Sequence, residues 1–295
     1  MGESLAVPSS NSTHIRSTTL PTREHPLNDI QLDEKLNKLR NWDVLASTSS
    51  SPVETLLNSL CGIGDLYQTV EDLLQLQQSK QGHVQGKVRV EQELDGSLRL
   101  LDTIGMVRDA LLQMKEHINI IQSALRRSKM QQELEIRIYA YLSFKKKMKK
   151  EVLKGFKELK RAQHNSQCFP VSETQGVIIR LTEARFITVS VFESLLDFMF
   201  KPRPKTARRS LVSKWMKRGQ VACEGQAEAM SEFARIEASL HSLCSQKSPT
   251  KQELQLVQKQ LDDLEKRVEE LDENLSSIFR SMIKTRVTLL NILGN

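Results

Sequence analysis

Turn-forming and aromatic residues are scarce in this chain. Its 295 residues include 12 glycines and 8 prolines, where average usage would give about 21 and 15. Phe, Trp and Tyr together make up 5%. A protein of many short strands needs frequent turns and aromatic strand residues, so these shortages disfavour a sheet fold and favour long helices. Hydrophobic residues make up 39%, which is enough for a sizeable core.

Cysteine is also rare. The four cysteines contain no C-x-x-C pair and are far apart: Cys61, Cys168, Cys223 and Cys244. This spacing supports neither a zinc site nor a disulfide framework, which favours a reducing compartment. The N-terminus lacks an apolar signal segment, and no run of about 18 apolar residues occurs. We therefore expect an intracellular, cytoplasmic protein that is not secreted, with the nucleus or the membrane periphery as alternatives.

Motifs of catalysis and cofactor binding are missing as well. The six histidines are dispersed without an H-E-x-x-H pattern, and the chain has no Walker loop and no G-x-S-x-G elbow. A partial dinucleotide motif at Gly62 and Gly64 lacks its third glycine, because Tyr67 occupies that place. We predict no catalytic, cofactor-binding or metal-binding residues. An enzyme without a recognisable motif is the least favoured alternative.

Hydrophobic periodicity divides the chain into a tail and a series of helices. Residues 1–27 are rich in Ser, Thr and Pro and show no periodicity, which predicts a disordered tail. Residues 28–295 predict an all-α bundle of about six to seven long antiparallel helices. The expected helices cover residues 28–42, 52–78, 88–127, 131–162, 173–200, 207–244 and 250–293, with a basic linker near 201–210.

Two glycines fall inside the expected helix over 88–127, namely Gly96 and Gly105. Glycine in a helix interior costs up to about 1 kcal/mol relative to alanine. We therefore expect another helix to approach closely at both positions.

The last expected helix, over 250–293, has the clearest pattern. Its apolar residues alternate at spacings of three and four from Leu254 to Ile292, which predicts a coiled-coil-like seam. Charge is sparse at the flanking positions, and Phe279 widens the apolar face. We therefore favour a seam packed within one chain, and a monomer, over a two-stranded dimer.

Two cationic segments are candidate anion-binding surfaces in a chain of net charge +7. In the first, lysines line one side of an expected helix and apolar residues the other, as in membrane-surface or calmodulin-target helices. The second, over 201–218, has no acidic residue and could attract anionic lipid or serve as a nuclear-import patch. Nucleic acid is disfavoured, since only Trp215 interleaves with these cations. The candidate residues are Lys145, Lys146, Lys147, Lys149, Lys150, Lys201, Arg203, Lys205, Arg208 and Arg209.

A structural alternative accounts for both segments without a ligand. The apolar side of the first helix could pack in the bundle while its lysines are only solvated. The second segment could be a solvated linker.

A phosphorylation motif is present in the tail. Residues Arg16 to Pro21 fit the pattern R-S-x-[S/T]-x-P, in which Thr19 would carry the phosphate. A phosphate there would suit an arginine cluster of the 14-3-3 type.

Short segments along the whole chain match the sequence pattern of a known protein family. They are His14–Ser17, Leu20-Pro21, His25-Pro26, Asp95–Asp102, Arg108-Asp109, Gln113–Glu116, Ser123–Arg127, Tyr141 with the lysine run, Phe279-Arg280 and Lys284–Leu293. Together they resemble a plant-specific family, domain-of-unknown-function family 241, which is related to the BYPASS proteins. The chain departs from the family pattern at Thr18-Thr19, where an Ile/Ser pair is expected, and at Ile104-Gly105, where a cysteine-containing pair is common.

The resemblance implies an all-helical plant protein without known catalytic residues. It also implies a part in root and shoot development, through control of a root-derived mobile signal. We therefore expect a non-enzymatic interaction or regulatory protein that works through protein partners. The alternative is a peripheral membrane protein that binds anionic lipid through its basic helices.

Overall fold

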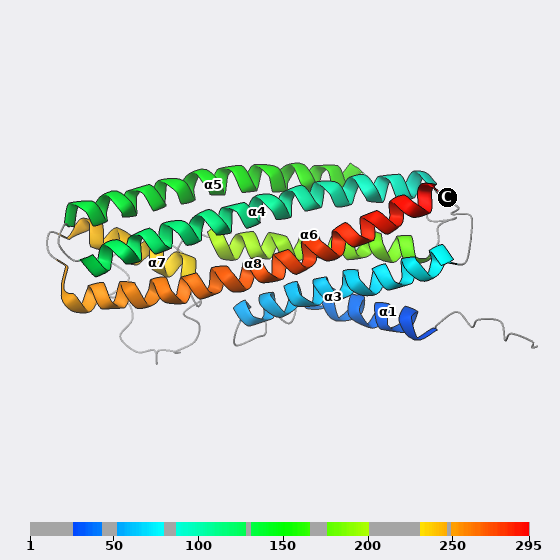
Figure 1. The fold of residues 1–295 in the computed structure, drawn as a ribbon, viewed down its shortest axis with the longest axis horizontal. Coiled ribbons are helices and arrows are strands. Elements are labelled where there is room, and N and C mark those ends of the chain that lie inside the picture. The colour runs from blue at the N-terminus through cyan, green and yellow to red at the C-terminus, as the bar shows by residue number, and fades with distance from the viewer. Residues whose placement is uncertain are drawn as a thin grey trace, which may run out of the picture.

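Seven helices make up the described part of the chain. The computed structural model describes residues 26–42, 52–79, 87–127, 131–165, 176–200, 231–246 and 249–294, and no strand occurs among them. Figure 1 shows the long helices lying roughly along one axis. This arrangement confirms the predicted all-α class. The helices are α1 (Pro26–Arg40), α3 (Pro52–Ser79), α4 (Lys87–Arg127), α5 (Gln131–Asn165), α6 (Gly176–Phe200), α7 (Glu232–Ser245) and α8 (Lys251–Gly294).

The last helix, α8, packs along both α3 and α4. It has 44 residues and is therefore about 66 Å long. It runs antiparallel to α4 and parallel to α3 (Figure 1). The predicted seam is the side that faces these two helices, so it packs within the chain as expected. Its buried apolar members are Val257, Leu261, Leu264, Val268, Leu271, Leu275, Ile278, Met282 and Leu289.

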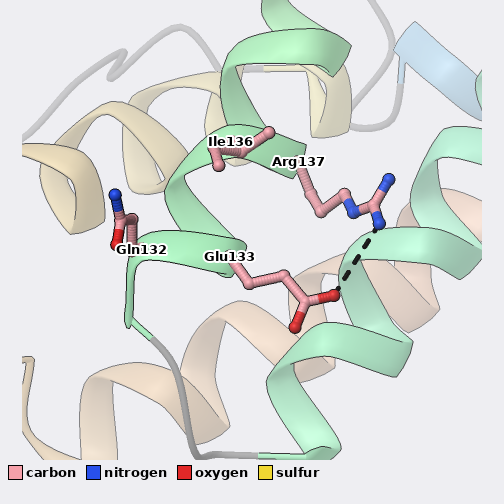
Figure 2. A pocket seen from close by; sticks show the side chains of 4 residues that line it. All are labelled: Gln132, Glu133, Ile136 and Arg137. Atoms are coloured by element: carbon pink, nitrogen blue, oxygen red, sulfur yellow. Dashed lines mark ion pairs between the residues drawn. The ribbon is translucent and has the colours of Figure 1, made fainter.

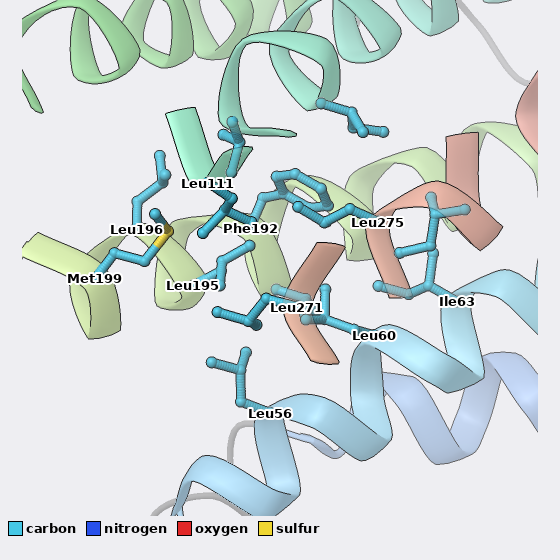
Figure 3. Close-up of a cluster of buried hydrophobic side chains, with 14 of the residues drawn as sticks. Leu56, Leu60, Ile63, Leu111, Phe192, Leu195, Leu196, Met199, Leu271 and Leu275 are labelled. Carbon is cyan, nitrogen blue, oxygen red and sulfur yellow. The ribbon is translucent and has the colours of Figure 1, made fainter. Parts of the chain in front are cut away.

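Helix α6 is enclosed by the other helices. Its buried residues cover most of its circumference, as its almost continuous apolar sequence predicts. Figure 3 shows Phe192 and Leu195 of α6 meeting Leu60 of α3 and Leu271 of α8. Side chains from four helices, including Leu111 of α4, thus share one core (Figure 3).

The starts of two helices are fixed by side-chain caps. Thr250 and Glu253 form a capping box at α8, in which each side chain accepts from the other's backbone N–H, at 2.8 and 3.3 Å. At α7, the Ser231 hydroxyl accepts from the Ala234 N–H, and Ser231 has extended backbone angles (φ −58°, ψ 151°). A continuous helix over 207–244 is therefore the wrong prediction, because the helix begins after Ser231; residues 201–230 lie outside the described residues.

The two glycines of α4 differ in their surroundings. A Cβ added at Gly96 would lie 2.8 Å from Cζ of Arg185, so the absence of a side chain lets this guanidinium from α6 pack against α4. At Gly105, nothing lies within 4 Å of an added Cβ. The expectation of a close approach is therefore confirmed at Gly96 and wrong at Gly105.

Candidate functional site

The apolar side of α5 is part of the core. Met148, Val152, Phe156 and Leu159 are all buried, with no more than 6% of their surface exposed. These are the residues that a membrane or a calmodulin-like protein would have to bind if α5 acted as a free amphipathic helix. Because they pack inside the bundle, only the opposite side of α5 is free to meet a partner.

Lys145 belongs to the interior and not to the cationic surface predicted for it. Its ammonium lies 2.7 Å from a Glu237 carboxylate oxygen and donates to the Phe233 carbonyl at 3.1 Å. Burial lowers the pKa of Lys145, and the hydrogen bond to Glu237 opposes that shift. Lys145 therefore ties α5 to α7, which removes it from the candidate anion-binding residues.

Lys149 also has a structural partner. Its ammonium donates to the carbonyl of Phe200, the last residue of α6, at 2.8 Å. The last carbonyls of a helix have no partner within the helix and carry the negative end of its dipole. Lys149 thus closes the end of α6 and has only part of its capacity left for an external anion.

Five further cations form one line on the outside of α5, which we name the α5 cationic stripe. Its five members are spaced by four, four, three and four residues, so they fall within about 80° of the helix circumference. Each is exposed, and none forms an ion pair with another described residue. The members are Lys146, Lys150, Lys154, Lys157 and Arg161.

Between the first and the last cation of the stripe, the acidic residues of α5 lie beside it and not on it, whereas Glu135, nearer the start of the helix, has the same angular position as Leu153. Glu151 is five residues after Lys146, which places it about 140° around the helix. It lies 3.9 Å from Lys147, another predicted anion-binding residue, and both side chains are highly exposed. An exposed pair of this kind is weak, so the positive charge of Lys147 still adds to the potential of the surface beside the stripe.

Three exposed apolar residues lie on the arc of the stripe or next to it. Ile136 and Tyr139 are each 60% exposed, and Leu153 is 38% exposed. Because α5 has 3.6 residues per turn, Tyr139 and Leu153 both lie within about 20° of Lys146. The charge pattern alone did not identify them, although counting helical positions outward from the lysine run would have done so.

A pocket at the start of α5 offers no comparable chemistry. Its lining residues, Gln132, Glu133, Ile136 and Arg137, all come from the first turns of one helix (Figure 2). Glu133 and Arg137 form an ion pair of 3.7 Å, and no nucleophile or histidine lines the pocket. The pocket is therefore a depression in the protein surface next to an ion pair.

Several ionisable groups in the interior are paired across helices. Glu93 of α4 and Arg185 of α6 are 2% and 4% exposed, and their closest atoms are 2.7 Å apart. Thr182 donates to the second carboxylate oxygen at 3.0 Å. Nearby, burial raises the pKa of Tyr67, whose hydroxyl lies 3.4 Å from that of Thr188. These groups hold α3, α4 and α6 together.

Two general findings concern the described residues as a whole. No group of three or more His, Cys, Asp or Glu side chains in this part of the chain is placed to hold a metal ion. No described helix combines the length and apolar character needed to cross a bilayer.

Several predicted site residues lie outside the described residues. They are Thr19 of the tail and Lys201, Arg203, Lys205, Arg208 and Arg209 of the second cationic segment. The predictions made for them remain predictions.

A family profile described as Protein BPS1 matches residues 59–292. The chain belongs to the BPS1 family. The match runs from α3 into the last turns of α8, and it confirms the resemblance to the BYPASS-related proteins. At the family level, BPS1 membership supports a regulatory role in plant development. Comparisons with curated proteins and with solved structures give no significant match.

Proposed function

We propose that this BPS1-family protein is a non-enzymatic regulator of root and shoot development that acts by binding an anionic partner through the α5 cationic stripe. One observation carries this function. Five exposed cations occupy one line of a helix that is held rigidly by the core, and no carboxylate lies among them. Cations in such an array raise the local concentration of anionic partners and orient them.

The burial and pairing of the interior ionisable groups favour a binding function over a catalytic one. A catalytic group needs a perturbed environment and also access to a substrate. The buried pair of Glu93 and Arg185 has no access to a substrate, and the Lys145 ammonium is engaged by Glu237. The exposed cations have access, but no histidine or cysteine of α5 lies among them.

Complementation of plants that lack the endogenous protein tests this function. We define a stripe variant, in which four cations of α5 are reversed, and a control variant with the same change in net charge on exposed positions of α8. The stripe variant is Lys146→Glu, Lys150→Glu, Lys154→Glu and Lys157→Glu. The control variant is Lys251→Glu, Lys259→Glu, Lys266→Glu and Lys284→Glu.

The control variant should restore normal root and shoot growth, and the stripe variant should not. Both should match the parent in far-UV circular dichroism and melting temperature, because all eight lysines are exposed. Full restoration by the stripe variant would show that α5 does not carry the function.

A second partner is suggested by the sequence of the tail. The pattern around Thr19 predicts phosphorylation-dependent binding of a 14-3-3 protein. Capture of 14-3-3 from plant extract should depend on phosphate at Thr19 and should be lost in Thr19→Ala. Equal capture by the phosphatase-treated protein would remove this partner.

A further inference from the structure

We infer that the anionic partner of the α5 cationic stripe is the surface of a lipid bilayer that contains acidic headgroups. The inference rests on the proposed function and names the class of its partner.

The shape of the stripe suits a flat surface. From Ile136 to Arg161 the outer side of α5 extends about 38 Å in a nearly straight line. Helix α5 also forms one long edge of the bundle (Figure 1). A planar array of headgroups can therefore contact the whole line at once, without any groove or rearrangement in the protein.

The composition of the stripe suits headgroups better than a single fixed phosphate. Four of its five cations are lysines, which act as point charges on flexible stems. A dedicated phosphate or carboxylate site typically uses the planar, bidentate geometry of arginine. Lysines in a row attract a fluid layer of anionic lipids without requiring any one headgroup to take a fixed position.

The exposed apolar residues favour a lipid bilayer over a nucleic acid or an acidic protein as the partner. Tyr139 and Leu153 lie in line with Lys146, and Ile136 lies on the same arc. At a bilayer, a tyrosine ring settles at headgroup level and aliphatic side chains enter the boundary of the acyl chains. A nucleic acid would need a series of aromatic side chains for stacking, and the arc has only Tyr139. An acidic protein would gain little from the isolated side chains of Ile136 and Leu153.

Vesicle co-sedimentation of the purified full chain tests the inference. The vesicles are pure phosphatidylcholine or the same lipid with roughly one-third phosphatidylserine, at about 0.05 and 0.5 M salt. The parent should sediment with the phosphatidylserine vesicles at low salt and be released at high salt. It should not sediment with pure phosphatidylcholine.

The variants show whether the binding belongs to α5. Each cation near such a surface contributes about fivefold, so the stripe variant should lose at least about 100-fold in partition. The control variant should stay within about tenfold of the parent, because its cations lie off the contact face. An uncharged variant, Tyr139→Ser with Leu153→Ser, should bind several-fold more weakly at unchanged salt dependence, since these side chains are exposed and only the apolar contact is lost.

Three results would overturn the inference: no sedimentation of the parent at low salt, equal losses in the stripe and control variants, or full binding by the stripe variant. If the vesicles are not bound but the stripe variant still fails to restore plant growth, the proposed function stands and the partner is an acidic protein or a nucleic acid. If the stripe variant does restore growth, the proposed function itself is wrong.

Discussion

Breaking the buried pair of Glu93 and Arg185 is the sharpest test of how the bundle is held together. We consider Glu93→Met, Arg185→Met and the double variant. In the parent, both side chains are at most 4% exposed, and Arg185 packs onto the bare backbone at Gly96. Each single variant leaves one uncompensated charge inside the core, with only Thr182 remaining as a hydrogen-bond partner for Glu93.

The expected magnitudes follow from that burial. Removal of one partner of a buried pair destabilises by about 3–5 kcal/mol, because the other charge stays desolvated. Replacement of both by apolar residues of similar volume is often nearly neutral. The two single variants should therefore lose about 3–5 kcal/mol each, whereas the double variant should stay within about 2 kcal/mol of the parent. This gives a coupling energy of at least about 4 kcal/mol.

Urea denaturation followed by far-UV circular dichroism measures these values, and the molecule supplies a matched control. Lys160 and Glu193 form an ion pair of similar length, 2.8 Å, with both side chains about half exposed. The same cycle on this pair should give less than about 1 kcal/mol. The reasoning is refuted if the buried pair gives a coupling energy as small as that of the exposed pair.

Three further results are expected. Leu264→Asp should cost at least about 4 kcal/mol and abolish cooperative melting, since Leu264 is fully buried in the α8 seam; a melting curve like the parent's would mean that the seam is not the core. Gly96→Ala should lose about 1–3 kcal/mol by displacing the guanidinium beside it, whereas Gly105→Ala should gain up to about 1 kcal/mol; urea titrations that rank them the other way would contradict this. Burial raises the pKa of both Tyr67 and Tyr141, so stability should fall as the pH rises above about 10, where the unfolded phenols ionise; an unchanged urea midpoint across that range would be inconsistent with buried phenols.

Helix positions could be predicted from local sequence because their signals are local. Helix α3 begins at Pro52, as the expected range 52–78 has it, and the alternation of three and four residues identified the buried side of α8. The start of α7 was missed because apolar residues continue on both sides of Ser231. The serine cap followed by Glu232 was the available signal.

The roles of single lysines could not be predicted, because they depend on residues far away in the sequence. Lys145 lies in a run of cations, yet its partner Glu237 comes 92 residues later. Lys149 meets the end of α6, 51 residues later. Helical periodicity places Lys145 on the buried side, between Tyr141 and Met148, and Lys149 at the edge of that side, but it does not identify the partner of either ammonium. Only the packing of α5 against α6 and α7 decides which cations stay on the surface.

The order of the helices has a consequence for synthesis of the chain. Thr288 of α8 donates to Glu71 of α3, 217 residues earlier, and the apolar sides of α3 and α4 are completed by α8. At a typical rate of synthesis, α3 leaves the ribosome roughly 10–40 s before its partner exists. During that time the side of α3 that packs on α8 remains uncovered, so the nascent chain is a natural client for chaperones. A transcript cut short before α8 would yield a product with no way to bury this surface, and such a product is expected to aggregate or be degraded.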